Sequence, residues 1–198
     1  GSSVPGKDPG QVAATRSDYD RWFTQMGELG VGVVRVYTIL SPAFYDALRD
    51  YNLRHAARPL YVLHGIWIPE ERWYATGNAW DPQVVRAMRS EIADAVAVVH
   101  GDAQIPYVRG HAAGVYRSDI SPWMLGWSFG IEWDPASVIA TNAKNAGRRA
   151  RSPGTYIHTL PSASPMEQWI GEHLDLLAGE EARRGFSIPL TFTNYRSV

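Results

Sequence analysis

Four apolar runs along the chain are short and rich in β-branched or aromatic residues, and segments with helical spacing separate them. The runs cover residues 31–39, 59–68, 124–131 and 188–193. Runs of this length, bounded by Gly and Pro, are typical of strands buried in a parallel sheet. The first run is long enough to predict a strand that is buried on both faces.

Helix signals precede or follow each of these runs. Ser17 is positioned to cap a helix over 18–29 that Gly30 ends. Proline at a first helical position predicts further helices from residue 42 to about 55, from 82 to about 100, from 135 to about 142 and from 165 to Gly185. We expect loops over 102–121 and 143–161, an N-terminal arm over 1–16, and a loop that holds Glu70, Glu71, Trp73 and Tyr74.

Strands that alternate with helices predict an α/β fold with a parallel sheet, in a single domain over 1–198. Two architectures fit: an open doubly wound sheet, or a partial (β/α)8 TIM barrel with about four strands. A whole barrel needs about 250 residues. No Gly-x-Gly-x-x-Gly follows any of the four strands, so a dinucleotide-binding sheet loses its main support.

The composition excludes several classes of protein. The 198 residues carry a net charge of −1, which gives no electrostatic reason to expect nucleic acid as a partner. Cysteine is absent, which excludes disulfides and a thiol nucleophile. No apolar run approaches 18 residues, so we expect no membrane segment. The localisation, extracytoplasmic or cytoplasmic, is not decided by the sequence.

The carboxyl ends of parallel strands face the ligand in α/β folds, so the residues there are the candidates for chemistry. Taken strand by strand they are Arg35, Tyr37 and Thr38; His64, Trp67, Glu70 and Glu71; Glu132, Trp133 and Asp134; Thr193, Asn194 and Tyr195.

Glu132 is the strongest of these candidates. A carboxylate at the tip of a buried strand needs an ionic partner or a wet cleft. Two hypotheses stay open: a salt bridge, for example to Arg35, and a general acid whose pKa Trp133 raises. Arg35, flanked by valines, requires a carboxylate or carbonyl partner in either case.

The other candidates divide into sugar contacts and structural residues. Trp67, Trp133 and Tyr195 end three strands, where aromatic rings stack on sugars and groups such as His64 and Asn194 take hydroxyls. Packing is the alternative for each ring, and a buried hydrogen bond is the alternative for His64. Asp134 is expected to cap a helix. The histidines and Glu132 lack ligand spacing, so no metal or other cofactor is expected.

Several segments resemble (β/α)8 glycoside hydrolases of bacteria, close to the β-galactosidase and cellulase superfamily. They are GVGVVRVYTI (30–39), PAFYDAL (42–48), LYVLHGIW (60–67), LGWSFGIEWDP (125–135), ASPME (163–167) and PLTFTNY (189–195). The likeness covers nearly the whole chain and is more specific for the type of domain than for the substrate.

The resemblance implies that the four strands are the second to the fifth of a barrel and that Glu132 is the acid/base at the end of the fourth. Ile131 stands where those enzymes often have Asn. Their nucleophile ends the seventh barrel strand, and we expect it outside this chain. Glu70 or Glu71 is an alternative second acid, at a separation that suits an inverting mechanism.

The resulting hypothesis is a glycoside hydrolase-type domain that acts on a carbohydrate through Glu132. The substrate-binding residues would be Arg35, Tyr37, His64, Trp67, Trp133, Asn194 and Tyr195. The alternative is a non-catalytic carbohydrate-binding or assembly module with a degenerate barrel. A partial barrel exposes strand edges, so we expect a homo-oligomer or the remainder of the barrel to complete the sheet.

Overall fold

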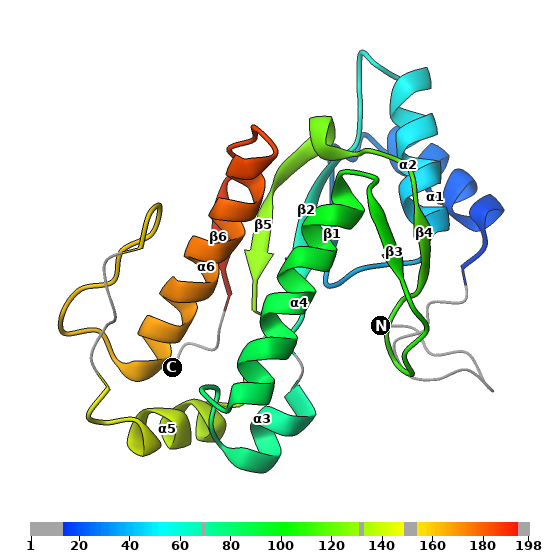
Figure 1. Cartoon of the computed structure of the whole chain (residues 1–198). Coiled ribbons are helices and arrows are strands. Elements are labelled where there is room, and N and C mark those ends of the chain that lie inside the picture. The colour runs from blue at the N-terminus through cyan, green and yellow to red at the C-terminus, as the bar shows by residue number, and fades with distance from the viewer. Residues whose placement is uncertain (1–13, 69, 131–132, 149–153, 194–198) are drawn as a thin grey trace. The chain divides into compact units, whose positions relative to one another are not determined.

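The computed structural model describes residues 14–68, 70–130, 133–148 and 154–193 (Figure 1). The predicted fold class is confirmed at the level of an α/β fold: a four-stranded parallel sheet with strand order β1-β2-β5-β6 and flanking helices. A separate antiparallel pair, β3-β4, is the second sheet.

The elements follow one another in the order that the sequence predicts, with three additions described below. The strands are β1 (Val33–Val36), β2 (Tyr61–Ile66), β3 (Ala103–Ile105), β4 (Gly114–Tyr116), β5 (Met124–Phe129) and β6 (Leu190–Phe192). The helices are α1 (Arg16–Glu28), α2 (Pro42–Arg54), α3 (Glu70–Thr76), α4 (Pro82–Val99), the 3-10 helix η1 (Ser121–Trp123), α5 (Pro135–Lys144) and α6 (Pro165–Arg183).

The chain divides into two compact units, and each is described by itself. The first holds residues 1–65 and 94–126, and the second holds residues 66–93 and 127–198. The strands β1, most of β2 and the start of β5 therefore belong to the first unit. The end of β5 and all of β6 belong to the second.

In the first unit, α1 and α2 pack through aromatic side chains. The rings of Tyr19 and Phe23 meet the ring of Phe44 edge to face, at 5.5 and 5.6 Å between centroids. The capping box of α1 uses Thr15 and Asp18, so the prediction of Ser17 as the cap is wrong. Thr15 is the cap because the Asp18 carboxylate, three residues later, accepts a hydrogen bond from the Thr15 amide in return. Thr15 and Arg16, which were expected in an N-terminal arm over 1–16, are thus the cap and the first residue of α1.

The strand β1 is buried on one face only, which corrects the prediction of burial on both. Val36 is buried, whereas Val33 is 45% exposed and Arg35 is also exposed. In the parallel register Val33 pairs with Tyr61 and Arg35 with Leu63, so these side chains share one face. The opposite face carries Val62 and His64, both fully buried under α2.

Three structured segments replace expected loops. Residues 70–76 form α3, residues 103–105 and 114–116 form the β3-β4 pair, and η1 begins at Ser121. Figure 1 shows β3 and β4 side by side as a two-stranded ribbon, and Ile105 is paired with Gly114. Gly and Pro in residues 102–121 predicted irregular backbone, and short strands and a helix of only two turns give little periodic signal.

In the second unit, α6 runs beside β5 and β6 (Figure 1) and carries the capping box that the sequence predicts, Ser164 with Glu167. The indole Nε1 of Trp127 on β5 donates to the Glu181 carboxylate of α6 at 2.8 Å. Both side chains are buried. This buried, charge-assisted bond ties the helix to the sheet.

Two buried histidines are neutral at ordinary pH. His64 donates from Nδ1 to the Gly65 carbonyl at 2.8 Å, and Nε2 accepts from the Tyr45 hydroxyl at 2.8 Å. His173 on α6 donates from Nδ1 to the Trp169 carbonyl at 2.7 Å. Burial lowers the pKa of each to about 4.

We expect stability to fall as the pH drops from 6.5 to 4, because unfolding lets His173 take up a proton that its native site refuses. The contribution of one such histidine is on the order of 3 kcal/mol. His173→Asn keeps an Nδ1-like donor and cannot titrate, so its unfolding free energy should depend less on pH in that window. Urea unfolding at several pH values measures this.

The matched control is His55→Asn. His55 also bonds from Nδ1 to a carbonyl four residues earlier, that of Tyr51, but its side chain is exposed. This variant makes the same substitution at the same kind of local bond but without burial, so it controls for the substitution itself. An equal flattening in both variants would show that burial of His173 is not the cause.

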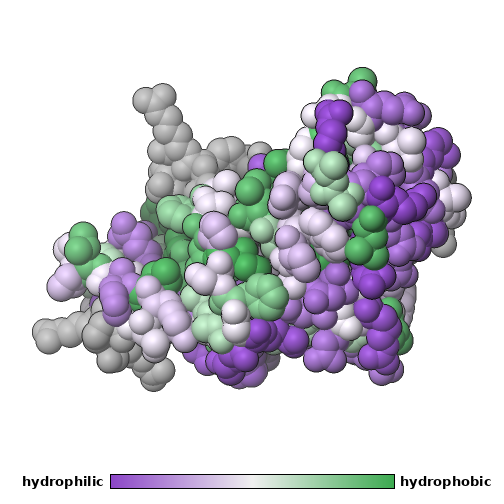
Figure 2. Space-filling view, turned by 90° about the horizontal axis from the view of Figure 1, so that it is seen from above, coloured by the Kyte–Doolittle hydropathy of each residue, from purple (hydrophilic) through white to green (hydrophobic). Residues whose placement is uncertain are grey.

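Within the described ranges, no helix is long and apolar enough to cross a membrane. Apolar side chains nevertheless reach the surface, as Figure 2 shows for one face of the molecule. In the first unit these include Val33, Tyr37, Tyr61 and Leu125, each between 41% and 49% exposed. All four lie on or just beyond strands of the parallel sheet.

Candidate functional site

The candidate site lies at the carboxyl end of β5 in the second unit. Gly130 follows β5 with a φ of 72°, and its carbonyl accepts from the Thr193 hydroxyl at 2.8 Å. The Thr193 amide donates to the Phe129 carbonyl at 3.1 Å. The β5-β6 pairing thus fixes the backbone up to Gly130. Glu132 itself lies outside the described residues, as do Asn194 and Tyr195.

Asp134 caps α5, as the sequence predicts. Its carboxylate accepts from the amide and the hydroxyl of Ser137, at 2.9 and 2.8 Å. These bonds hold the pKa of Asp134 below its ordinary value. The carboxylate is therefore committed to the helix end, and the α5 cap sets the backbone just after Glu132.

A hydrogen bond joins α3 to this backbone. The Tyr74 hydroxyl accepts from the Asp134 amide at 3.4 Å. Burial raises the pKa of Glu70 on the same helix. Burial also raises the pKa of Tyr74 to about 12, so the phenol keeps its proton. The helix α3 is thus tied to the residue that caps α5.

Trp133 belongs to an aromatic cluster. We define this aromatic cluster as Trp73, Phe129, Trp133, Trp169 and His173. The Trp133 ring is fully buried and meets the rings of Trp73, Phe129 and Trp169 edge to face, at 5.5 to 6.0 Å. A buried ring cannot stack on a sugar. Trp133 therefore packs in the core, which is the alternative that the sequence analysis left open for this ring.

Thr141 on α5 anchors the aromatic cluster. Its hydroxyl oxygen accepts from Trp73 Nε1 at 2.9 Å and from the Ala79 amide at 3.0 Å. Thr141, Trp73 and Ala79 are all fully buried. One side-chain oxygen thus satisfies two buried donors, so its loss would leave both without an acceptor.

We expect Thr141→Val to lower the free energy of unfolding by about 2–4 kcal/mol, because each unsatisfied buried donor costs about 1–3 kcal/mol. Thr141→Ser keeps the oxygen and loses only a methyl group, so its loss should be about 1 kcal/mol. Urea unfolding of both variants tests this. Equal losses would mean that the methyl contact, and not the two hydrogen bonds, carries the stability.

The first unit positions three of the predicted site residues. His64 is fully buried and bonded at both ring nitrogens, so it takes the core alternative that the sequence left open. The Arg35 guanidinium lies 4.8 Å from the centroid of the Tyr37 ring. Arg35 and Tyr37 are both exposed, and their contact is a cation–π pair. The carboxylate that the sequence analysis suggested for Arg35, Glu132, lies outside the described residues.

Trp67, in the second unit directly after β2, is 39% exposed. Of the three aromatic residues predicted to stack on sugar, it is the one whose described ring reaches solvent. Its place just beyond the carboxyl end of a parallel strand is the position that the sugar-platform prediction requires.

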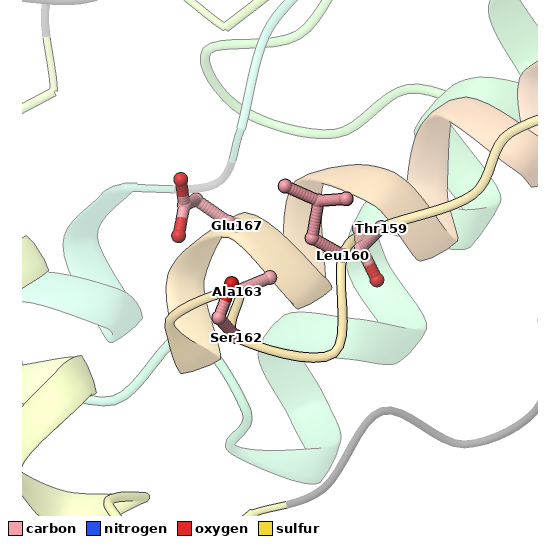
Figure 3. A pocket seen from close by; sticks show the side chains of 5 residues that line it. All are labelled: Thr159, Leu160, Ser162, Ala163 and Glu167. Atoms are coloured by element: carbon pink, nitrogen blue, oxygen red, sulfur yellow. The ribbon is translucent and has the colours of Figure 1, made fainter.

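The remaining features of the structure offer few groups for catalysis or ligand binding. Among the described residues no group of three or more His, Asp or Glu is arranged to hold a metal. A shallow pocket of about 210 Å³ lies at the start of α6, lined by Thr159, Leu160, Ser162, Ala163 and Glu167 (Figure 3). The Glu167 carboxylate is already used in the capping box with the Ser164 amide. This pocket is smaller than ordinary ligand sites.

The contact of Tyr74 is the one that the sequence analysis missed, because Tyr74 was placed in a loop. It lies on α3, and its hydroxyl accepts from the Asp134 amide 60 residues away. No local pattern in residues 70–76 signals a contact at that separation.

The chain matches no protein-family model, no curated protein and no solved structure. The site must therefore be argued from its own geometry.

Proposed function

We propose that this chain is a glycoside hydrolase-type domain in which Glu132 acts as a general acid on a carbohydrate. The observation that carries the proposal is the strand order β1-β2-β5-β6, in which β5 precedes Glu132 in the sequence and the exposed ring of Trp67 directly follows β2. Hydrolysis of a glycosidic bond requires two carboxyl groups. Glu132 is proposed as one of them, and Glu70 and Glu71 on α3 are the candidates within this chain for the other.

Between the two architectures that the sequence left open, the strand order favours a barrel segment and does not favour a doubly wound sheet. The strands β1, β2, β5 and β6 are neighbours in chain order, with no reversal of direction of the kind that gives a doubly wound sheet its switch point. In the first unit, α2 covers one face of the β1-β2 pair and the other exposes Val33, Arg35 and Tyr61. A barrel strand has helices on one face only, and its other face meets the barrel interior. The proposal is that the four strands are the second to the fifth of such a barrel.

The substrate contacts in this proposal are exposed aromatic and polar groups. In the second unit, Trp67 supplies a ring to stack on a sugar. In the first unit, the exposed Arg35–Tyr37 pair offers a ring and hydroxyl-binding donors of its own. Asn194 and Tyr195 stay in the proposal as further contacts. His64 and Trp133 are left out, because both are buried.

A second candidate is a non-catalytic carbohydrate-binding or assembly module. The exposed apolar side chains of Val33, Tyr37 and Tyr61 on the parallel sheet favour it, because such surface is ordinarily covered by another chain or another part of the same protein. In this alternative the sheet is completed by a homo-oligomer or by the rest of a barrel, and Trp67 binds sugar without turnover.

Hydrolysis of a panel of 4-nitrophenyl glycosides separates the two candidates. Release of nitrophenol by the 198-residue chain supports the hydrolase. Quenching of tryptophan fluorescence by a free sugar, abolished in Trp67→Ala and without turnover, would replace it with the binding module. If the panel gives no turnover and no quenching, both carbohydrate proposals are rejected.

A further inference from the structure

One face of the β1-β2 pair in the first unit gathers apolar and aromatic side chains around a single guanidinium. We define this β1-β2 face as Val33, Arg35, Tyr37, Tyr61 and Leu63. In the parallel register Val33 pairs with Tyr61, and Arg35 pairs with Leu63, so these side chains point to the same side of the sheet. Val33 and Tyr61 are 45% and 41% exposed, and Arg35 is exposed beside them. The buried side chains of the pair point the other way, under α2.

Tyr37 extends the β1-β2 face at the carboxyl end of β1. Its backbone passes close over Gly65, the residue two positions after Leu63, because a Cβ on Gly65 would lie only 2.4 Å from the Tyr37 carbonyl oxygen. The Tyr37 ring is 49% exposed, and its centroid lies 4.8 Å from the Arg35 guanidinium carbon. The close approach at Gly65 and the cation–π contact thus hold Tyr37 and Arg35 together on the surface.

The Arg35 guanidinium keeps its hydrogen-bond donors for a ligand. It has five N–H donors, and within the described ranges of the chain it makes no ion pair and no side-chain hydrogen bond. Arg21 on α1 is different, although its guanidinium also lies near a ring, 5.9 Å from the centroid of Trp22. Arg21 is paired with the Asp18 carboxylate at 3.0 Å. The two arginines are therefore matched in exposure and ring contact but not in the availability of their donors.

The charges on the β1-β2 face select the class of ligand. The face carries one cation and no anion among its five residues, so it complements a negatively charged group. The planar fork of a guanidinium matches the two oxygens of a carboxylate. Exposed aromatic rings beside it stack on the C–H faces of sugars. A uronic acid combines both features, because it is a sugar that carries a carboxylate on its ring.

We infer that the β1-β2 face binds an acidic saccharide, with Arg35 holding the carboxylate of a uronic acid and the rings of Tyr37 and Tyr61 contacting the sugar. The inference rests on the proposed function and deepens it, because it names the class of carbohydrate for both the hydrolase and the binding module. The position at the carboxyl end of β1 agrees with it, since α/β folds bind their ligands at that end of the strands.

Calorimetric titration of the 198-residue chain with oligosaccharides of glucuronate and galacturonate, each beside its methyl ester, tests the inference. The ester keeps the sugar ring and removes the charge. The acid should bind about 10–100-fold more tightly than its ester, as expected for hydrogen bonds to a charged group. Arg35→Gln should lose that preference and keep the affinity for the ester. Arg35→Lys keeps the charge without the fork, so its preference should be intermediate.

Arg21→Gln is the matched control and should keep the wild-type preference for the acid. Tyr37→Phe retains the ring and should bind like the wild type, whereas Tyr37→Ala should weaken the binding of acid and ester alike.

Three results would overturn the inference: equal affinity for acid and ester, an unchanged preference in Arg35→Gln, or an equal loss in Arg21→Gln. In each case, binding or hydrolysis of a neutral saccharide would leave the proposed function standing. A chain that neither binds nor hydrolyses any saccharide, acidic or neutral, rejects the proposed function and the inference with it.

Discussion

Glu132→Gln abolishes the hydrolysis of glycosides with poor leaving groups and spares those with good ones: this is the result we expect if Glu132 is the general acid. An alkoxide leaving group needs a proton in the transition state, whereas dinitrophenolate departs without one. The loss in kcat/KM should therefore be about 10²–10⁴-fold on an alkyl glycoside. It should be several-fold at most on the matching 2,4-dinitrophenyl glycoside.

Asp134→Asn is the matched control, since it removes a negative charge two residues from Glu132. Asparagine is as good an N-cap as aspartate, so the bonds to the Ser137 amide and hydroxyl persist and α5 keeps its start. This variant should retain wild-type turnover on both substrates. An equal loss on both leaving groups in Glu132→Gln would mean that Glu132 binds or positions the substrate and does not supply the proton.

The fold was predictable where periodicity and capping chemistry agree. The proline after Ser41, Asp81, Asp134 and Ser164 marks the start of four helices, and each of α2, α4, α5 and α6 begins at that proline. The four apolar runs are the four strands of the parallel sheet. Both signals are local, because a cap or a strand depends on residues that are neighbours in the sequence.

The predictions failed where tertiary contacts decide. The run of β-branched residues at 31–39 indicated a strand buried on both faces, but burial depends on what packs against each face, and α2 covers only one. Val33 and Arg35 therefore stay exposed. The environment of His64 was likewise undecidable from the sequence, because its partner Tyr45 lies 19 residues away on α2.

The candidate site shows the same division. The position of Glu132 after an apolar strand and before an Asp-Pro cap could be read from the sequence. The contact of α3 with the cap of α5 could not, because it joins the Tyr74 hydroxyl to a backbone amide 60 residues away. Trp133 was assigned to a sugar surface because it ends a strand. Its burial depends on Trp73 and Trp169, which belong to α3 and α6.

Gly130→Ala should be among the most destabilising small substitutions in the second unit, because two separate costs add. Its φ of 72° is left-handed, which costs a residue with a side chain about 1–2 kcal/mol. A Cβ at this position would also lie 2.4 Å from the Trp133 ring carbon Cζ2. The aromatic cluster holds that ring on three sides, so overpacking adds about 1–3 kcal/mol.

Gly185→Ala isolates the first cost. Its φ is 82°, and a Cβ there would meet nothing within 4 Å. Urea unfolding should therefore show a loss of about 1–2 kcal/mol for Gly185→Ala and a loss larger by about 1–3 kcal/mol for Gly130→Ala. Equal losses would mean that the Trp133 ring moves aside at no cost and that the cluster is less rigid than its packing indicates.

A double-mutant cycle with Trp133→Phe then assigns the second cost to the indole. Phenylalanine lacks the outer part of the indole, including the carbon nearest the added Cβ, so the clash should be relieved in Gly130→Ala combined with Trp133→Phe. The double variant should be more stable than the sum of the single losses by about 1 kcal/mol or more, as expected for side chains in direct contact. Additive losses would place the cost in the backbone alone. A favourable coupling would show that the packing of Trp133 fixes the turn through which β5 leads to Glu132.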